Sequence, residues 1–188
     1  MTLKSIRSVL IFLCSLATIS RSSAHGKHLR LTYPSARATL YFKGDTTKPV
    51  GEVYFIQMPG GEVIVKGGVR GLTPGKHGFH VHQNPSLEDD CKGAGPHFNP
   101  FGQTHGHKAS AMRHVGDLGN ILTSEGSSHT RIHKVDNVIS TNMGESNIIG
   151  RALVVHAGED DLGQGGDEGS LKTGNAGARV ACGIIEKY

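Results

Sequence analysis

The sequence lacks a sustained helical period of apolar residues and any apolar run long enough to cross a membrane. Its main apolar run, residues 9–19, is about half the roughly 20 residues that a bilayer-spanning helix needs. Basic residues interleaved with aromatic ones, a pattern typical of nucleic-acid interfaces, are also absent. These absences argue against a helical fold, a membrane-spanning protein and a nucleic-acid-binding protein.

The short apolar run follows two basic residues and precedes the small residues at positions 22–24. This order is typical of a secretory signal peptide, and its shortness argues against the alternative of a membrane anchor. We therefore predict a signal peptide at residues 1–24, cleaved after Ala24, and one secreted domain at residues 25–188.

Charge and cysteine content both change when this segment is removed. Cleavage takes away Lys4, Arg7 and Arg21 and no acidic residue, so the 20 basic residues fall by three to 17, against 16 acidic ones. The nearly balanced charge that is left gives no reason to expect nucleic acid or a membrane as a partner. Of the three cysteines, only Cys91 and Cys182 remain. An even pair in an exported protein predicts a disulfide, with two buried free thiols as the alternative.

Short segments of alternating apolar and polar residues are separated by Gly-rich turns, which indicates an all-β protein. The predicted strands are residues 36–42, 51–58, 62–72, 76–82, 117–123, 128–135, 148–156 and 179–185. Eight strands at this spacing predict an antiparallel Greek-key barrel or sandwich. Residues 83–116 and 157–178 do not alternate and are longer than ordinary connections, so we predict two long functional loops.

A series of potential metal ligands begins in the segment GFHVH at residues 78–82. On a strand, His80 and His82 point to the same side and can offer two nitrogens to one metal ion. Taken alone, such a pair is weak evidence and indicates surface or hydrogen-bonded histidines more often than a metal site. Five further potential ligands follow it in the chain: His97, His105, His114, Asp117 and His156. Imidazoles with a single carboxylate suit zinc and copper.

The motifs around these residues resemble the copper/zinc superoxide dismutase family. The resemblance runs over residues 31–185 and is carried by GFHVH (78–82), GPHFNP (95–100), HVGDLGN (114–120), VVH (154–156) and GNAGAR (174–179). It implies an oxidoreductase that converts two superoxide anions and two protons to oxygen and hydrogen peroxide by Cu(II)/Cu(I) cycling.

The resemblance also implies one copper ion and one zinc ion per subunit. Copper would be held by His80, His82, His97 and His156. Zinc would be held by His97, His105, His114 and Asp117. His97 would then bridge the two metals and carry a proton in the reaction.

Four further residues gain a role from the resemblance. Asp160 matches the carboxylate that links a copper histidine to a zinc histidine, with an ordinary solvated loop acid as the alternative. Arg179 matches the arginine of the active site, although a lone arginine in a Gly-rich segment would otherwise indicate a surface charge. Lys172 and Thr173 match residues of the substrate channel.

The other histidines are given no metal. His77 is predicted to be a structural hydrogen-bonding residue in a turn. His107 stands where the family usually has glycine and is predicted to be exposed, with competition for metal as the alternative. No role is predicted for His25, His28, His129 and His133.

Some positions depart from the family pattern. The resemblance implies a homodimer, but Asn84 and Pro85 replace an aromatic-glycine pair of the dimer loop, and the final residues 186–188 lack the usual apolar contact. The same final residues lack the basic extension with which some extracellular members of the family bind heparin-like polysaccharides. We therefore expect the protein to diffuse freely after secretion. Gly169 replaces a frequent glutamate of the electrostatic loop.

Two rival functions are compatible with the same fold. A non-enzymatic copper-delivery module would be expected to lack a copper ligand or the arginine, and no Cys-x-x-Cys or Cys-x-Cys motif is present. A purely structural β-sandwich leaves the ordered series of ligands unexplained.

Overall fold

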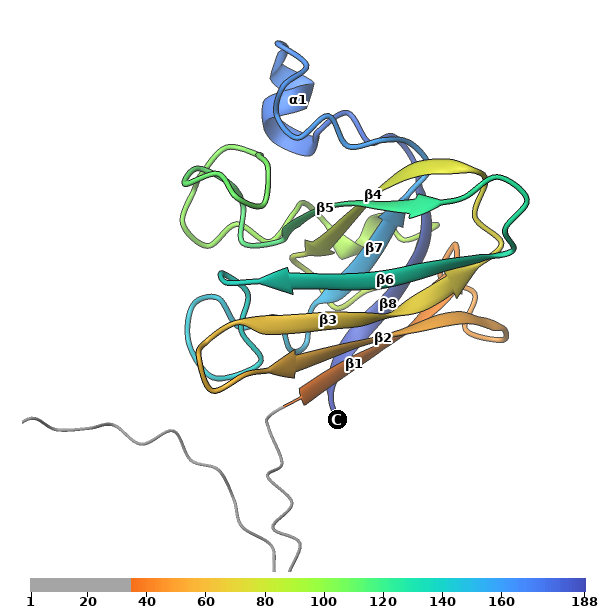
Figure 1. Cartoon of the computed structure of the whole chain (residues 1–188), viewed down its shortest axis with the longest axis horizontal. Coiled ribbons are helices and arrows are strands. Elements are labelled where there is room, and N and C mark those ends of the chain that lie inside the picture. The colour runs from red at the N-terminus through yellow and green to blue at the C-terminus, as the bar shows by residue number, and fades with distance from the viewer. Residues whose placement is uncertain (1–34) are drawn as a thin grey trace, which may run out of the picture. The chain divides into compact units, whose positions relative to one another are not determined.

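The computed structural model describes residues 35–188, in which eight antiparallel strands form a nearly closed barrel (Figure 1). The strands are β1 (Ser35–Phe42), β2 (Pro49–Gln57), β3 (Val63–Arg70), β4 (Gly75–His82), β5 (Asp117–Thr123), β6 (His129–Asp136), β7 (Ala152–His156) and β8 (Arg179–Lys187). The described part also contains a 3₁₀ turn, η1 (Lys92–Ala94), and a short helix, α1 (Glu168–Thr173). The predicted signal peptide, His25 and His28 lie outside the described residues.

The strands are hydrogen-bonded in the order β5-β4-β7-β8-β1-β2-β3-β6. Because β3 pairs with β6, and β4 pairs with both β5 and β7, the chain crosses the barrel between β3 and β4 and again between β6 and β7. The two end strands, β5 and β6, contact each other and nearly close the barrel. The predicted all-β, eight-stranded antiparallel fold is confirmed.

The alternation of residue types places the core inside the barrel. On β1, Ala36, Ala38 and Leu40 are fully buried, while the residues between them are partly exposed. On β4, by contrast, both faces are buried from His77 onward, including His80 and His82. The second face of β4 is covered because the loop that follows folds back, with His97 paired to His82 in an isolated bridge. This loop turns an outer strand surface into an interior site.

Most predicted strands differ from the structure by one or two residues at an end, and one differs by four. The strand predicted from residue 148 begins at Ala152, because Ile148 is buried in a turn where its amide bonds to the carbonyl of Ser140. The last strand continues past Ile185 to Lys187, where it pairs with β1. Apolar residues predict burial better than they predict the exact end of a strand.

The helix α1 was not predicted from the sequence. Asp167 caps its first turn by accepting a hydrogen bond from the amide of Ser170, and Gly174 ends it in the left-handed conformation. With six residues, α1 is too short to give an apolar period. Across residues 35–188, no helix has the length and apolar character needed to span a membrane.

A disulfide and a buried ion pair are among the links that attach the long loop between β4 and β5 to the barrel. The predicted disulfide between Cys91 and Cys182 is confirmed and joins the loop to β8, closing a separation of 91 residues. In the chain-entropy account, such a closure stabilises the fold by about 4–5 kcal/mol. Near the other end, the buried guanidinium of Arg113 pairs with Asp136 of β6 at 2.8 Å. Removing one partner of such a buried pair typically costs about 3–5 kcal/mol.

Candidate metal centre

The predicted ligands converge from three strands and one loop. Strand β4 supplies His80 and His82, β5 begins with Asp117, and β7 ends with His156. The loop between β4 and β5 supplies the other three: His97, His105 and His114. All seven side chains are buried.

One group consists of imidazoles alone. The ligand atoms of His80, His82, His97 and His156 all lie within 4.8 Å of one another. The Nε2 atoms of His82 and His156 are 3.3 Å apart, and the rings of His80 and His97 are centred 4.2 Å apart. Four neutral imidazoles at this distance form a nitrogen site that suits copper.

The second group adds a carboxylate. Oδ1 of Asp117 lies 2.9 Å from Nδ1 of His97, 2.9 Å from Nδ1 of His105 and 3.1 Å from Nδ1 of His114. Three imidazoles and one carboxylate make a closed set of four ligands of the kind that holds structural zinc. His97 belongs to both groups.

Backbone carbonyls determine which ring nitrogens are free to bind metal. Nδ1 of His82 lies 2.8 Å from the carbonyl of Gly95, and Nδ1 of His156 lies 3.0 Å from that of Gly177. A carbonyl only accepts hydrogen bonds, so each Nδ1 carries the hydrogen. The lone pair is therefore on Nε2 of both rings, which faces the imidazole group.

Three buried ring nitrogens have no hydrogen-bond partner among the described residues: Nδ1 of His80, Nε2 of His97 and Nδ1 of His105. Nδ1 of His105 is close to Asp117 but is not aligned for a hydrogen bond. Buried polar atoms without partners are rare in folded proteins. Metal ions bound between the ligands would give all three atoms a partner, so the residues fit copper and zinc.

Asp160 connects the two groups. Its Oδ2 lies 2.8 Å from Nε2 of His80, and its Oδ1 lies 2.7 Å from Nε2 of His105. Its main chain is held by the side chain of Asn120, which accepts from the amide and donates to the carbonyl, both at 2.8 Å. The carboxylate is fully buried, so it is not a solvated loop acid.

The electrostatics differ between the two groups. Burial lowers the pKa of His80 and His82, and it lowers the pKa of His156 to about 4, so these rings are neutral at pH 7. Burial would also lower the pKa of His105, but the nearby carboxylates of Asp117 and Asp160 outweigh it and raise the pKa of His105 to about 9. Neutral rings suit metal binding directly, whereas a metal at His105 displaces a proton.

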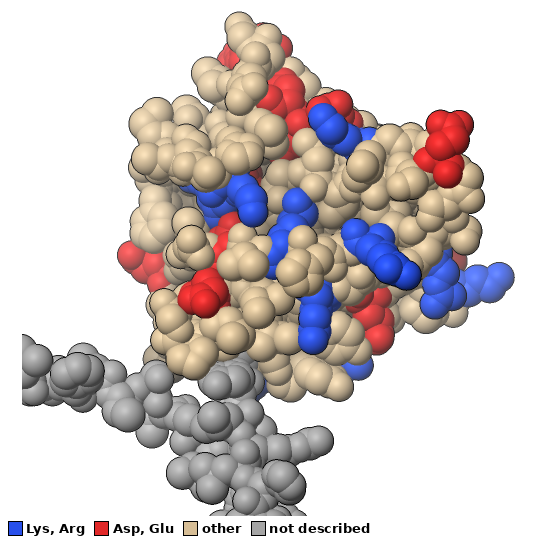
Figure 2. Space-filling view, viewed as in Figure 1, with Lys and Arg blue, Asp and Glu red and all other residues tan. Residues whose placement is uncertain are grey.

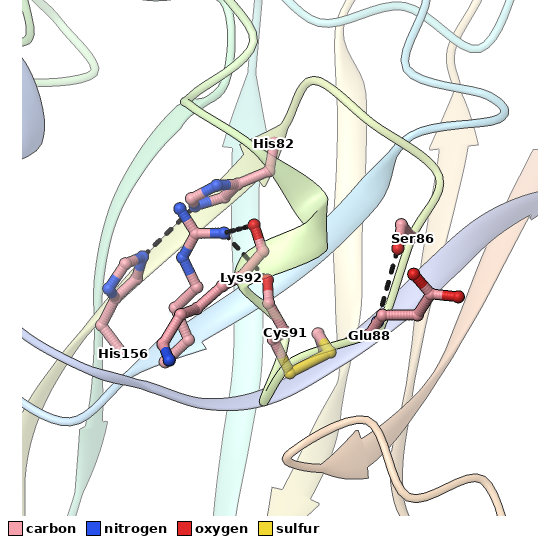
Figure 3. Close-up of a disulfide and its surroundings, with 8 residues drawn as sticks. His82, Ser86, Glu88, Cys91, Lys92 and His156 are labelled. Carbon is pink, nitrogen blue, oxygen red and sulfur yellow. Dashed lines mark hydrogen bonds between the residues drawn. A yellow bond between two sulfur atoms is a disulfide. The ribbon is translucent and has the colours of Figure 1, made fainter.

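Arg179 is fixed by the main chain of the disulfide-linked loop. Its guanidinium donates to the carbonyl of Cys91 at 2.8 Å, to that of Lys92 at 3.1 Å, and to that of Gly95. Gly95 also accepts from His82. Figure 3 shows His82 and His156 facing each other beside Cys91, Lys92 and the disulfide. The disulfide therefore supports the carbonyls that orient the arginine.

Three residues of the imidazole group, His82, His97 and His156, line an open cavity of about 960 Å³. Its walls include Arg179 and two exposed residues of α1, Lys172 and Thr173. They also include Glu168, which the sequence reasoning missed and which pairs with Lys172 at 2.5 Å. Glu168 is the residue directly before Gly169. Glu168 and Lys172 are four residues apart, a spacing that favours an ion pair on a helix and could have indicated this pair from the sequence.

The remaining described histidines lie outside both groups. His77 is in β4 rather than in a turn, which corrects that prediction, because the strand already begins at Gly75. Its two nitrogens lie 2.9 Å and 2.8 Å from the carbonyls of His156 and Thr73, so it is a structural hydrogen-bonding residue as expected. His107 is exposed, and its Nδ1 accepts from the amide of Ala109.

Comparison with protein families gives one match that covers most of the described chain. The sequence model of the family described as copper/zinc superoxide dismutase matches residues 50–185.

Individual proteins are similar over comparable lengths. An extracellular superoxide dismutase [Cu-Zn] from Brugia pahangi is 48% identical over 155 residues, covering 80% of this chain and 76% of the relative. A superoxide dismutase [Cu-Zn] from Onchocerca volvulus is 50% identical over 157 residues, covering 80% of this chain and 96% of the relative. The crystal structure of the clock protein EA4 has a TM-score of 0.76 and 44% identity, covering 88% of this chain and all of that one.

Proposed function

The chain belongs to the copper/zinc superoxide dismutase family, and we propose that its two buried ligand groups hold the copper and the zinc of that family. As a member, it is an oxidoreductase that converts two superoxide anions and two protons to oxygen and hydrogen peroxide. The group of four imidazoles would hold copper, because nitrogen ligands serve both of its oxidation states. The group that contains Asp117 would hold zinc as a closed site.

The observation that carries this assignment is the position of His97 in both groups. Its Nδ1 lies 2.9 Å from Asp117. Its Nε2 is buried without a hydrogen-bond partner in the described chain, and the ring centre lies 4.2 Å from that of His80. A ring with each nitrogen directed to a different ligand group is suited to bridge two metal ions.

The chain's own residues would position the substrate and a proton. When bound, copper would supply the one-electron chemistry, and zinc would supply charge without redox change. His97 can hold one of the two protons at Nε2 and pass it to the developing peroxide. Asp160 keeps the rings of His80 and His105 in the orientation that frees their Nδ1 atoms. Arg179 provides a fixed positive charge for the superoxide anion at the cavity wall.

Metal titration of the purified protein tests this proposal. Metal-free protein should bind one copper and one zinc per chain, and superoxide dismutation should appear only when copper is present. Binding of both metals without dismutation would favour a copper-delivery module. Zinc alone should leave the protein inactive, which makes the zinc-loaded sample the matched control.

We also propose that the protein is secreted and acts as a homodimer. Two similar relatives are described as extracellular, and residues 1–24 have the pattern of a signal peptide. Protein recovered from the medium of expressing cells should begin at His25 and sediment as a dimer. An intact N-terminus would contradict the cleavage, and a monomer mass at micromolar concentration would contradict the dimer.

A further inference from the structure

Lys134 breaks the pattern of strand β6. Its neighbours on the inward row, Thr130, Ile132 and Asp136, are buried, whereas the residues between them face outward. Lys134 stands on this inward row and is half-buried. A lysine at such a position is costly unless its ammonium finds a partner.

The partner of Lys134 lies across the open seam of the barrel. No main-chain ladder joins β5 to β6 within residues 35–188, since these strands are the two ends of the hydrogen-bonded order. The ammonium of Lys134 donates to the carbonyl of Asn120 on β5 at 2.6 Å. Nearer the turn, the hydroxyls of Thr123 and Thr130 lie 2.6 Å apart. Strands β5 and β6 lie side by side in Figure 1, and side chains hold them together along this seam.

The Lys134 bond leads directly to the metal centre. The main-chain carbonyl of Asn120 accepts the hydrogen bond from Lys134. The side-chain amide of Asn120 accepts a hydrogen bond from the main-chain amide of Asp160 and donates one to its main-chain carbonyl. The carboxylate of Asp160 in turn holds His80 and His105. Three consecutive hydrogen-bonded steps thus connect a barrel-wall lysine to one ligand of each metal group.

We propose that Lys134 is a positioning residue for the metal centre, which holds Asn120 and, through it, Asp160 in the place that orients His80 and His105. The charges around the ammonium agree with this role. Burial and the charge of Lys108 lower the pKa of Lys134, while Asp136 and Asp160 act in the opposite direction. Lys134 is therefore close enough to Asp160 to interact with it electrostatically as well as through Asn120. The inference deepens the proposed function and rests on its ligand assignment.

The test compares Lys134→Met with two matched variants. Methionine keeps an unbranched apolar stem but cannot donate to Asn120. Lys66→Met removes an exposed lysine of the neighbouring strand β3, for which the described chain contains no hydrogen bond or ion pair. Thr123→Val removes the other side-chain bond of the seam without touching Asn120. The three proteins are loaded with copper(I) and zinc, and metal release to a chelator is followed.

We expect Lys134→Met to release metal about tenfold faster than the wild type, since loss of a group that orients a ligand typically lowers metal affinity by about 10–100-fold. The ring N–H resonances of His80 and His105, which report their bonds to Asp160, should also shift. Lys66→Met should behave like the wild type. Thr123→Val should lower the melting temperature without moving these resonances, and Lys134→Arg should restore both properties.

Unchanged release and resonances in Lys134→Met would overturn the inference, and so would equal changes in Thr123→Val, because loosening of the seam would then suffice. Lys134→Gln, whose side chain is too short to reach Asn120, gives the same decision if the methionine variant does not fold. Failure of the wild type to bind two metals would instead overturn the ligand assignment, so the two failures can be told apart.

Discussion

Replacing His156 by alanine should abolish superoxide dismutation while zinc stays bound. His156 contributes only to the group of four imidazoles, and its Nε2 faces that of His82. It makes no contact with Asp117, around which the second group is built. Loss of one of four nitrogens should remove copper or leave it in an inactive geometry. Metal analysis together with an activity assay measures both parts of this result.

His97→Ala is the informative companion variant, because His97 is shared by the two groups. It should lower the content of both metals, whereas His156→Ala lowers only copper. His133→Ala, which removes an exposed histidine of β6, should leave both metals and the activity unchanged. Full copper occupancy with full activity in His156→Ala would refute the copper assignment.

The fold could be predicted from the sequence where one residue type alternates with another. The strand at residues 36–42 is an example, because its three inward residues are small or aliphatic and are fully buried. The helix α1 was not predicted because it is stabilised by a cap at Asp167 and an ion pair between Glu168 and Lys172 rather than by a buried face. Such local signals are weaker than periodicity in a sequence, although the left-handed Gly174 marks its end.

The candidate site shows a similar division. Potential ligands carry their chemistry in their own side chains, so the series from His80 to His156 could be found before the structure, and the structure brings these residues into two adjoining groups. Asn120 and Lys134 act by hydrogen bonds across the β5–β6 seam. Those bonds depend on which strands meet, and residue types alone do not reveal that. The one local signal is a lysine on the inward row of β6.

Arg179→Glu should slow the reaction more than tenfold and abolish or reverse its dependence on salt. The guanidinium is held at the cavity wall by the carbonyls of Cys91, Lys92 and Gly95, so its charge is fixed rather than mobile. A unit charge about 5 Å from an anion contributes roughly 3 kcal/mol at an effective dielectric constant of about 20. Arg179 is only half-buried, so solvent and salt should reduce this to about 1–2 kcal/mol, or about tenfold in rate for Arg179→Ala.

Two further variants separate charge from structure. Arg179→Lys keeps the positive charge and should retain most of the rate and the salt dependence of the wild type. Lys172→Ala removes a cation from the same cavity, but its effect should be smaller because Lys172 is exposed and already paired with Glu168. Copper and zinc contents must be equal in all variants, since Arg179 and His82 share the carbonyl of Gly95.

Ionic strength then gives the decisive comparison. At physiological salt the Debye length is about 8 Å, so added salt should slow the wild type by screening the attraction between superoxide and the cavity. In Arg179→Glu the same salt should screen a repulsion between superoxide and the cavity. The rate should then stay unchanged or rise as salt is added. Pulse radiolysis of fully metallated proteins measures both slopes. Equal rates and equal slopes in the two proteins would show that Arg179 only supports the loop and does not attract the substrate.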